Sequence, residues 1–148
     1  MNDALGDDPK HLGRLIFEIF RLNGRLLAAG DALVGELGLT SARWQVLWAI
    51  AIAEVPQPVA HLARAMGLNR QGVQRIVNEL EAEGLIAFRD NPNHLRAKLV
   101  ELTGKGRETY AAAARLRQPW LAGLADGLTA AEVDAALRAI SVLRRRLE

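Results

Sequence analysis

Cysteine is absent from this chain of 148 residues. Disulfides, thiolate metal sites, cysteine nucleophiles and thiol-based redox sensing are therefore excluded. The sequence also lacks a run of about 18 apolar residues, so no transmembrane helix and no membrane partner are expected. The N-terminus carries Asp3, Asp7 and Asp8 where a secretory signal would be basic, which favours a cytoplasmic protein.

Motifs for catalysis are missing as well. The sequence contains no glycine-rich phosphate loop, no serine elbow and no pair of carboxylates at catalytic spacing. His11, His61 and His94 are scattered, with no partner three or four residues away, so metal binding and general-base catalysis are not expected. The sequence predicts neither an enzyme nor a cofactor.

What is present is helical periodicity and enough apolar residues for one domain, since half of the chain is hydrophobic. Pro119 is expected to kink or break the long helix in which it lies. Strands are expected on either side of a turn of roughly six residues rich in Asp, Asn and Pro. The expected helices cover 11–29, 41 to the break at Pro56, 59–66, 69–83, 103 to beyond 114, and 130–146, and the expected strands cover 85–89 and 97–102. Gly30 or Gly35 is expected to end the first helix, Thr40 and Asn69 are expected to cap the second and fourth, and Thr129 and Glu132 have the spacing of a capping box for the last.

Residues 59–78 match the pattern of a helix-turn-helix. Ala63 is small where two helices would cross, and Gly67 provides a permissive residue in the turn four positions later. The small core of this motif is expected to comprise Leu62, Met66, Leu68, Val73 and Ile76. The alternative is a plain helical hairpin, which needs apolar residues but does not require a small residue at the crossing and a glycine in the turn.

The helix that begins at Asn69 carries a polar face without acids over its first two turns. An ordinary solvated face mixes both signs, whereas arginine and glutamine are the side chains that read guanine and adenine, and free amides in a first turn can bind phosphate. The net charge of the chain is only +2, but residues 61–98 carry an excess of basic over acidic residues. We therefore predict a DNA-recognition surface formed by Asn69, Arg70, Gln71, Gln74 and Arg75.

A hairpin directly after a helix-turn-helix predicts a winged helix, a mainly α fold with a small β-hairpin wing. Arg89, Arg96 and Lys98 frame the tip of this hairpin. We expect Arg96 and Lys98 to contact the DNA backbone or minor groove. In the alternative interpretation these two side chains are only solvated, and Arg89 pairs with Asp90 or a nearby glutamate.

Two stretches resemble the MarR family of bacterial transcriptional regulators. They read "LARAMGLNRQGVQRIVNELEAEGLI" at residues 62–86 and "RDNPNHLRAKLVELTGKG" at residues 89–106. The second is similar to the family's wing, and His94 and Leu95 stand where the family commonly has Asp and Arg. The residues that match the wing pattern are Asp90, Arg96, Ala97, Lys98, Val100, Leu102, Thr103 and Gly106.

The resemblance covers nearly the whole chain and implies one domain over 1–148, with a DNA-binding part at 38–102. Residues 10–30 and 103–148 then correspond to helices that interlock two subunits, and their apolar stripes favour a homodimer over a monomeric bundle. Twofold symmetry would match a pseudo-palindromic operator. The basic cluster at 144–146 is expected to be solvated rather than bound to DNA.

The resemblance also implies a cleft for small aromatic or phenolic anions between the dimerisation helices and the winged helix. Trp44 and Trp48 lie four residues apart and share a helix face. Core packing is the alternative role for both tryptophans. The residues expected to line such a cleft are Arg14, Phe17, Trp44, Trp48 and Tyr110.

The sequence thus predicts a homodimeric, sequence-specific regulator that binds double-stranded DNA, acting as a repressor that responds to a ligand. Two other interpretations stay open. One is an architectural DNA-binding protein without an effector. The other is a dimeric interaction protein that has lost affinity for DNA, for which the His94–Leu95 change in the wing is the support.

Overall fold

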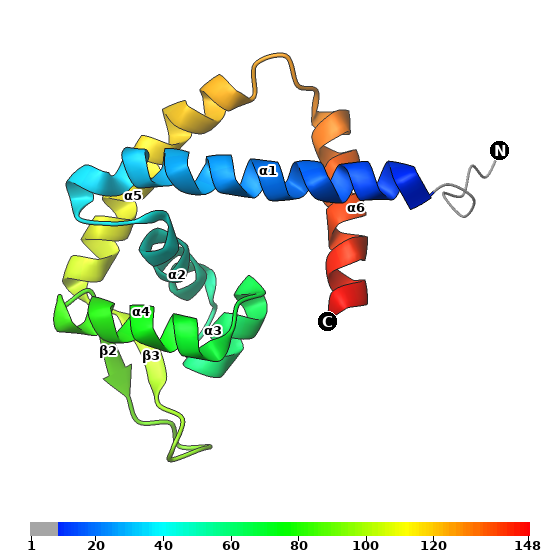
Figure 1. Ribbon diagram of the computed structural model, residues 1–148. Helices are drawn as coiled ribbons and strands as arrows, with labels where there is room; N and C mark the ends of the chain where they lie inside the picture. The colour runs from blue at the N-terminus through cyan, green and yellow to red at the C-terminus, as the bar shows by residue number, and fades with distance from the viewer. Residues whose placement is uncertain (1–8) are drawn as a thin grey trace. The chain divides into compact units, whose positions relative to one another are not determined.

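The structure, a computed structural model, describes residues 9–148 (Figure 1). Asp3, Asp7 and Asp8 lie outside these residues. The chain divides into two compact units, one that extends to Ala114 and one from Arg115 to Glu148. No helix within 9–148 has the length and apolar character needed to cross a membrane. The elements in chain order are α1 (Pro9–Val34), η2 (Gly35–Leu37), α2 (Ser41–Ile52), β1 (Gln57–Pro58), α3 (Val59–Met66), α4 (Arg70–Ala82), β2 (Ile86–Arg89), β3 (Leu99–Leu102), α5 (Gly104–Leu124) and α6 (Ala130–Leu147).

Helix α1 extends beyond the predicted 11–29 and continues through Gly30, so it ends at the second of the two expected positions, just before Gly35. Gly30 is buried against the start of α2, where an added Cβ would overlap the Ser41 hydroxyl. The Ser41 hydroxyl donates to the carbonyl of Leu27 at 2.6 Å, and the Ser41 N–H donates to the Asp31 carboxylate at 2.6 Å. Gly30 therefore permits two helices to approach closely and does not end the first of them.

The helix-turn-helix is confirmed. Helix α3 ends at Gly67, whose φ of 65° is the left-handed conformation that glycine adopts readily. Asn69 caps α4, because its side-chain oxygen accepts from the N–H of Gly72 at 2.7 Å. The prediction for Leu68 was wrong: its side chain is 48% exposed. The turn directs it to solvent, while Val73 and Ile76 are buried as expected.

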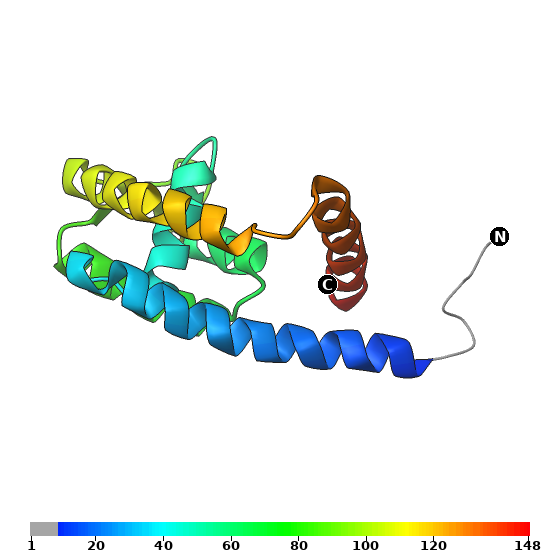
Figure 2. The same cartoon turned by 90° about the horizontal axis from the view of Figure 1, so that it is seen from above.

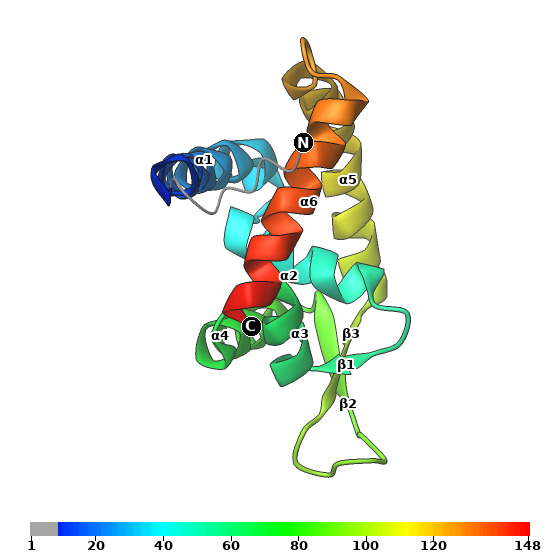
Figure 3. The ribbon, with the colours of Figure 1, turned by 90° about the vertical axis from the view of Figure 1, so that its right-hand side faces the viewer.

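The sheet has three strands in the order β1-β3-β2, all antiparallel, rather than the two predicted. The strand missed by the sequence analysis, β1, has two residues and pairs Gln57 with Val100. We predicted only a helix break there, because Pro56 precedes this strand and Pro58 is its second residue. On its other side, β3 pairs Val100 with Phe88 of β2 (Figure 3).

One continuous core joins α2, α4 and the sheet within the first unit. Side chains of each element are fully buried there, so the recognition helix and the wing are packed on the same scaffold. The largest fully buried side chains are Val34, Val46, Leu47, Val73, Val77, Leu80, Ile86 and Val100.

In the second unit, α6 begins with the predicted capping box. The Thr129 hydroxyl accepts from the N–H of Glu132 at 3.2 Å, and the Glu132 carboxylate accepts from the N–H of Thr129 at 2.8 Å. These hydrogen bonds lower the pKa of Glu132. We predicted a kink or a break at Pro119, and the helix does not break there, because α5 runs unbroken from Gly104 to Leu124. Pro119 is exposed, so water can satisfy the carbonyl that its missing N–H leaves free.

Candidate nucleic-acid interface

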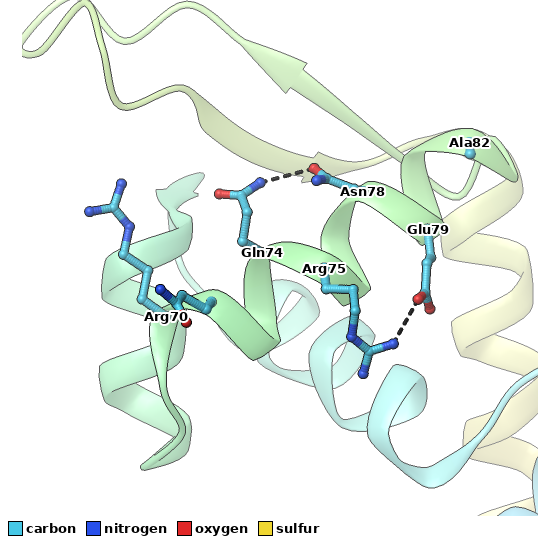
Figure 4. A pocket seen from close by; sticks show the side chains of 7 residues that line it. Arg70, Gln74, Arg75, Asn78, Glu79 and Ala82 are labelled. Atoms are coloured by element: carbon cyan, nitrogen blue, oxygen red, sulfur yellow. Dashed lines mark hydrogen bonds and ion pairs between the residues drawn. The ribbon is translucent and has the colours of Figure 1, made fainter.

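Helix α4 is anchored by its apolar face and presents its polar face to solvent. Val73, Val77 and Leu80 are fully buried, which fixes the rotation of the helix about its axis. The opposite face carries the predicted Arg70, Gln71, Gln74 and Arg75 around one shallow hollow (Figure 4). The same hollow is also lined by Asn78, Glu79 and Ala82.

Two hydrogen-bonded pairs run along this hollow, each linking residues one turn apart. The Gln74 side-chain amide donates to the side-chain oxygen of Asn78 at 2.9 Å. The Arg75 guanidinium donates to the Glu79 carboxylate at 2.8 Å (Figure 4). Asn78 and Glu79 were not among the predicted site residues. Their i,i+4 spacing from Gln74 and Arg75 is the sequence signal that could have identified them.

The Asn69 side chain contacts its own helix rather than standing free. Its oxygen is occupied by the N–H of Gly72, so this residue sets where α4 begins. Asn69 therefore orders the first turn of the surface that carries Arg70 and Gln71. Contact between Asn69 and phosphate stays a prediction.

A groove lies between α4 and the wing. Arg70, Gln74 and Asn78 line it from the helix, and Arg96 and Lys98 line it from the hairpin. Two elements that are distant in the sequence therefore place three permanent cations along one depression. No acidic residue is among the described residues that line it, so the local potential is more positive than the net charge of the chain indicates.

The tip of the wing is longer than predicted, spanning residues 90–98. The prediction that Ala97 and Lys98 belong to the second strand was wrong, because turn hydrogen bonds fold the chain there. The buried Asn91 donates its side-chain amide to the carbonyl of Ala97 at 3.0 Å, and the N–H of Ala97 donates to the carbonyl of His94 at 3.1 Å. At the tip, Leu95 is 88% exposed.

Arg89 has the partner that the alternative interpretation offered. Its guanidinium donates to the Glu101 carboxylate of β3 at 3.0 Å. This pair links the two strands near the end of the hairpin that leads into the tip. Arg96 and Lys98, by contrast, are both exposed and line the groove beside α4.

The five residues predicted to line an effector cleft occupy several places. Trp44 and Trp48 stack with their ring centroids 6.0 Å apart. Trp44 is buried, and its indole N–H has no hydrogen-bond partner within the described chain. Trp48 lines a hollow between α2 and α3, Tyr110 lines another beside Arg107, and Arg14 and Phe17 are exposed on α1. The structure therefore does not gather the five around one hollow of a single chain.

Comparison with known proteins agrees with this geometry. A model described as MarR family matches residues 37–97, which span α2 to the wing. An uncharacterized protein of Mycobacterium tuberculosis is 39% identical over 101 residues, which cover 68% of this chain and 69% of that protein.

Solved structures extend the likeness to the terminal helices. MarR of E. coli superimposes with a TM-score of 0.70 at 27% identity, covering 89% of this chain and 96% of that one. CouR of Rhodococcus jostii RHA1, bound to p-coumaroyl-CoA, has a TM-score of 0.79 at 23% identity and coverage of 96% and 95%. The repressor CouR bound to a 23-mer DNA duplex has a TM-score of 0.76 at 24% identity and coverage of 92% and 96%. The winged helix-turn-helix, the family match and this shared fold show that the chain belongs to the MarR family of DNA-binding transcriptional regulators.

Proposed function

We propose that this regulator acts as a homodimeric repressor that binds a pseudo-palindromic operator and responds to a small aromatic ligand. The observation that carries the DNA part of this proposal is the groove between α4 and the wing. It is lined by three permanent cations and by no acidic residue among the described residues that border it. Duplex DNA, which carries about one negative charge per 1.7 Å of its axis, is the ligand that such a surface fits.

In the proposed complex α4 enters the major groove with its polar face toward the bases. Arg70, Gln71, Gln74 and Arg75 then contact base edges or phosphates, since arginine and glutamine can each form bidentate contacts with a purine. Arg96 and Lys98 reach the backbone or the minor groove beside it. The CouR structure on a 23-mer duplex supports DNA as the partner.

The dimer is supported by apolar side chains that a single chain leaves uncovered. In Figure 2 the N-terminal half of α1 extends beyond the other helices of its unit, and Phe17 and Phe20 on it are 63% and 70% exposed. Helix α6 has no buried residue, and Val133, Leu137 and Ile140 are exposed on it. Large aromatic and aliphatic side chains at this exposure are typical of surfaces that another copy covers. A dimer would also present two recognition helices to two half-sites.

The effector part of the proposal is supported by the Trp44–Trp48 stack and by the buried indole N–H that lacks a partner. A ligand with an aromatic ring and an acceptor group suits these features. CouR, which shares the fold, is solved with p-coumaroyl-CoA.

Tryptophan fluorescence tests the effector proposal. Phenolic acids and p-coumaroyl-CoA are expected to cause a saturable change in emission below millimolar concentration, because a ring that binds beside Trp48 alters the surroundings of its indole. The double variant Trp44→Phe, Trp48→Phe keeps only Trp120 and should lose the response. Emission that does not change with any of these ligands up to millimolar concentration would contradict the proposal.

Removal of the Arg96 side chain tests the role of the wing. Arg96→Ala is expected to weaken binding to every DNA sequence to a similar extent and to reduce the slope of log K against log salt by about one, as for a phosphate contact. Arg89→Ala is the matched comparison from the same hairpin. Because the Arg89 guanidinium already pairs with Glu101, Arg89→Ala should reduce the affinity for DNA less than Arg96→Ala does. If Arg96→Ala leaves the slope of log K against log salt unchanged, Arg96 does not contact the DNA.

Fluorescence anisotropy with DNA from upstream of the protein's own gene tests the regulator itself. We expect nanomolar binding that weakens steeply with salt, and much weaker binding to a scrambled duplex. Binding that is equally weak on both probes, and on every natural upstream region tried, would favour the architectural interpretation. Absence of binding even at low salt would favour an interaction protein.

A further inference from the structure

We propose that Glu79 is a specificity-determining residue that acts through Arg75. In this view its carboxylate holds the guanidinium in one orientation on the face of α4, so that Arg75 reads a single base position and does not bind whichever phosphate is nearest. The inference rests on the proposed docking of α4 on DNA. Glu79 serves here as a positioning residue, and Arg75 makes the contact.

An acid lies on the predicted DNA-contact face of α4, directly beside one of its arginines. The Glu79 carboxylate lies 2.8 Å from the Arg75 guanidinium, in the same hollow as Arg70, Gln71 and Gln74 (Figure 4). The two side chains remain 43% and 70% exposed, so both are available to a ligand that covers this face. Glu79 is the one acid among the residues that line this hollow.

The Gln74–Asn78 pair has the same spacing along α4 as the Arg75–Glu79 pair. The Gln74 amide is held by Asn78, one turn further along the helix. Gln74 and Arg75, two of the four residues proposed to contact bases, are therefore held toward the C-terminal half of α4. The free backbone N–H groups that can bind phosphate lie at the other end of the helix. A tethered guanidinium keeps its remaining N–H donors for a bidentate contact with guanine.

The physical effect on discrimination follows from charge. An arginine with free rotamers gains affinity from any phosphate, and this gain is the same for every sequence. A carboxylate that pairs with the guanidinium offsets that attraction, so the penalty falls mainly on DNA that offers Arg75 no base contact in return. Specificity improves because binding to the wrong DNA is weakened.

Glu79→Gln removes the charge and leaves the shape and helix propensity nearly unchanged. Exposed ion pairs of this kind add little to stability, so the variant should fold as the wild type does. Glu81→Gln is the matched control, since Glu81 is an exposed glutamate on the same helix that does not line the hollow. The probes are the preferred duplex and a scrambled duplex, each measured by anisotropy across a salt series.

We expect Glu79→Gln to tighten binding to the scrambled duplex and to reduce the ratio of the two affinities by about fivefold or more, relative to Glu81→Gln. The slope of log K against log salt on scrambled DNA should steepen by about one, as the released Arg75 gains one phosphate. If Glu79→Gln and Glu81→Gln have the same affinities and slopes on both probes, the inference is overturned.

An Arg75→Ala background separates action through Arg75 from general repulsion. There, Glu79→Gln should change the affinity for scrambled DNA no more than Glu81→Gln does. A larger tightening in that background would show that Glu79 acts without Arg75 and would overturn the inference. A wild-type protein that does not distinguish the two duplexes would instead contradict the proposed function, so the two failures are distinguishable.

Discussion

Replacement of Gly106 by alanine is expected to lower the free energy of unfolding by about 3 kcal/mol and to weaken DNA binding as well. Gly106 is buried in the first turn of α5, and a Cβ there would overlap the backbone carbonyl oxygen of Leu85. A backbone atom cannot rotate aside as a side chain does. The same carbonyl accepts from the N–H of Thr103 at 3.1 Å, so its displacement disturbs the start of both α5 and the wing.

Urea denaturation of Gly106→Ala measures this effect, and Gly104→Ala is the matched control. Gly104 lies two residues earlier in the same helix, and an added Cβ there would meet no atom within 4 Å. Alanine at Gly104 should be neutral or slightly stabilising, because it reduces the entropy of the unfolded chain. If the two variants are equally stable, the backbone of Leu85 does not lie against Gly106 as the structure has it.

Arg75→Ala or Gln71→Ala is expected to reduce affinity for the preferred DNA site by about 1–3 kcal/mol and to relax specificity at the base position concerned. Both side chains line the exposed hollow on α4, and loss of a bidentate base contact costs about this amount. The measurement is the dissociation constant on the preferred duplex and on duplexes that carry single base changes.

Arg64→Ala provides the control for charge. Arg64 is exposed in the last turn of α3 and lines neither the hollow on α4 nor the groove beside the wing, so its loss should change affinity little. If Arg75→Ala, Gln71→Ala and Arg96→Ala all bind as tightly as the wild type, the docking of α4 and the wing on DNA is incorrect.

Local signals in the sequence predicted most element boundaries. Thr40, Asn69 and Thr129 were predicted as caps, and each accepts a backbone N–H at the start of its helix. Gly67 and Gly84 have positive φ where the helices were predicted to end. Such features depend on a few neighbouring residues, so they can be read without the rest of the fold.

Features that depend on tertiary contacts were missed. Strand β1 exists only because β3 pairs with it, and the wing tip is set by the buried Asn91 rather than by strand propensity. Gly30 could not be distinguished from Gly35 as the end of α1, because nothing local indicates that α2 crosses at Gly30, and the helix in fact ends just before Gly35. Gly106 matched a family pattern, but the steric reason for it required the position of Leu85.

The sequence identified the residues of the candidate DNA-binding surface better than it predicted how they are arranged in space. Sequence periodicity placed Arg70, Gln71, Gln74 and Arg75 on one face, and the structure adds Arg96 and Lys98 to a groove beside that face. The sequence prediction considered only the first two turns of α4, which contain no acid. It therefore missed Glu79, which lies in the third turn and pairs with Arg75. Membership in a family of non-enzymatic regulators agrees with the expectation that the chain is not an enzyme.

Selection from a pool of random duplexes with the purified wild-type protein tests the central claim most directly, because it requires no guess about the operator. The account predicts enrichment of an inverted repeat whose half-site centres lie about one helical turn of DNA apart, with two chains bound per duplex. A pool that shows no sequence enrichment after successive rounds, or an enriched site without twofold symmetry that binds one chain, would contradict it.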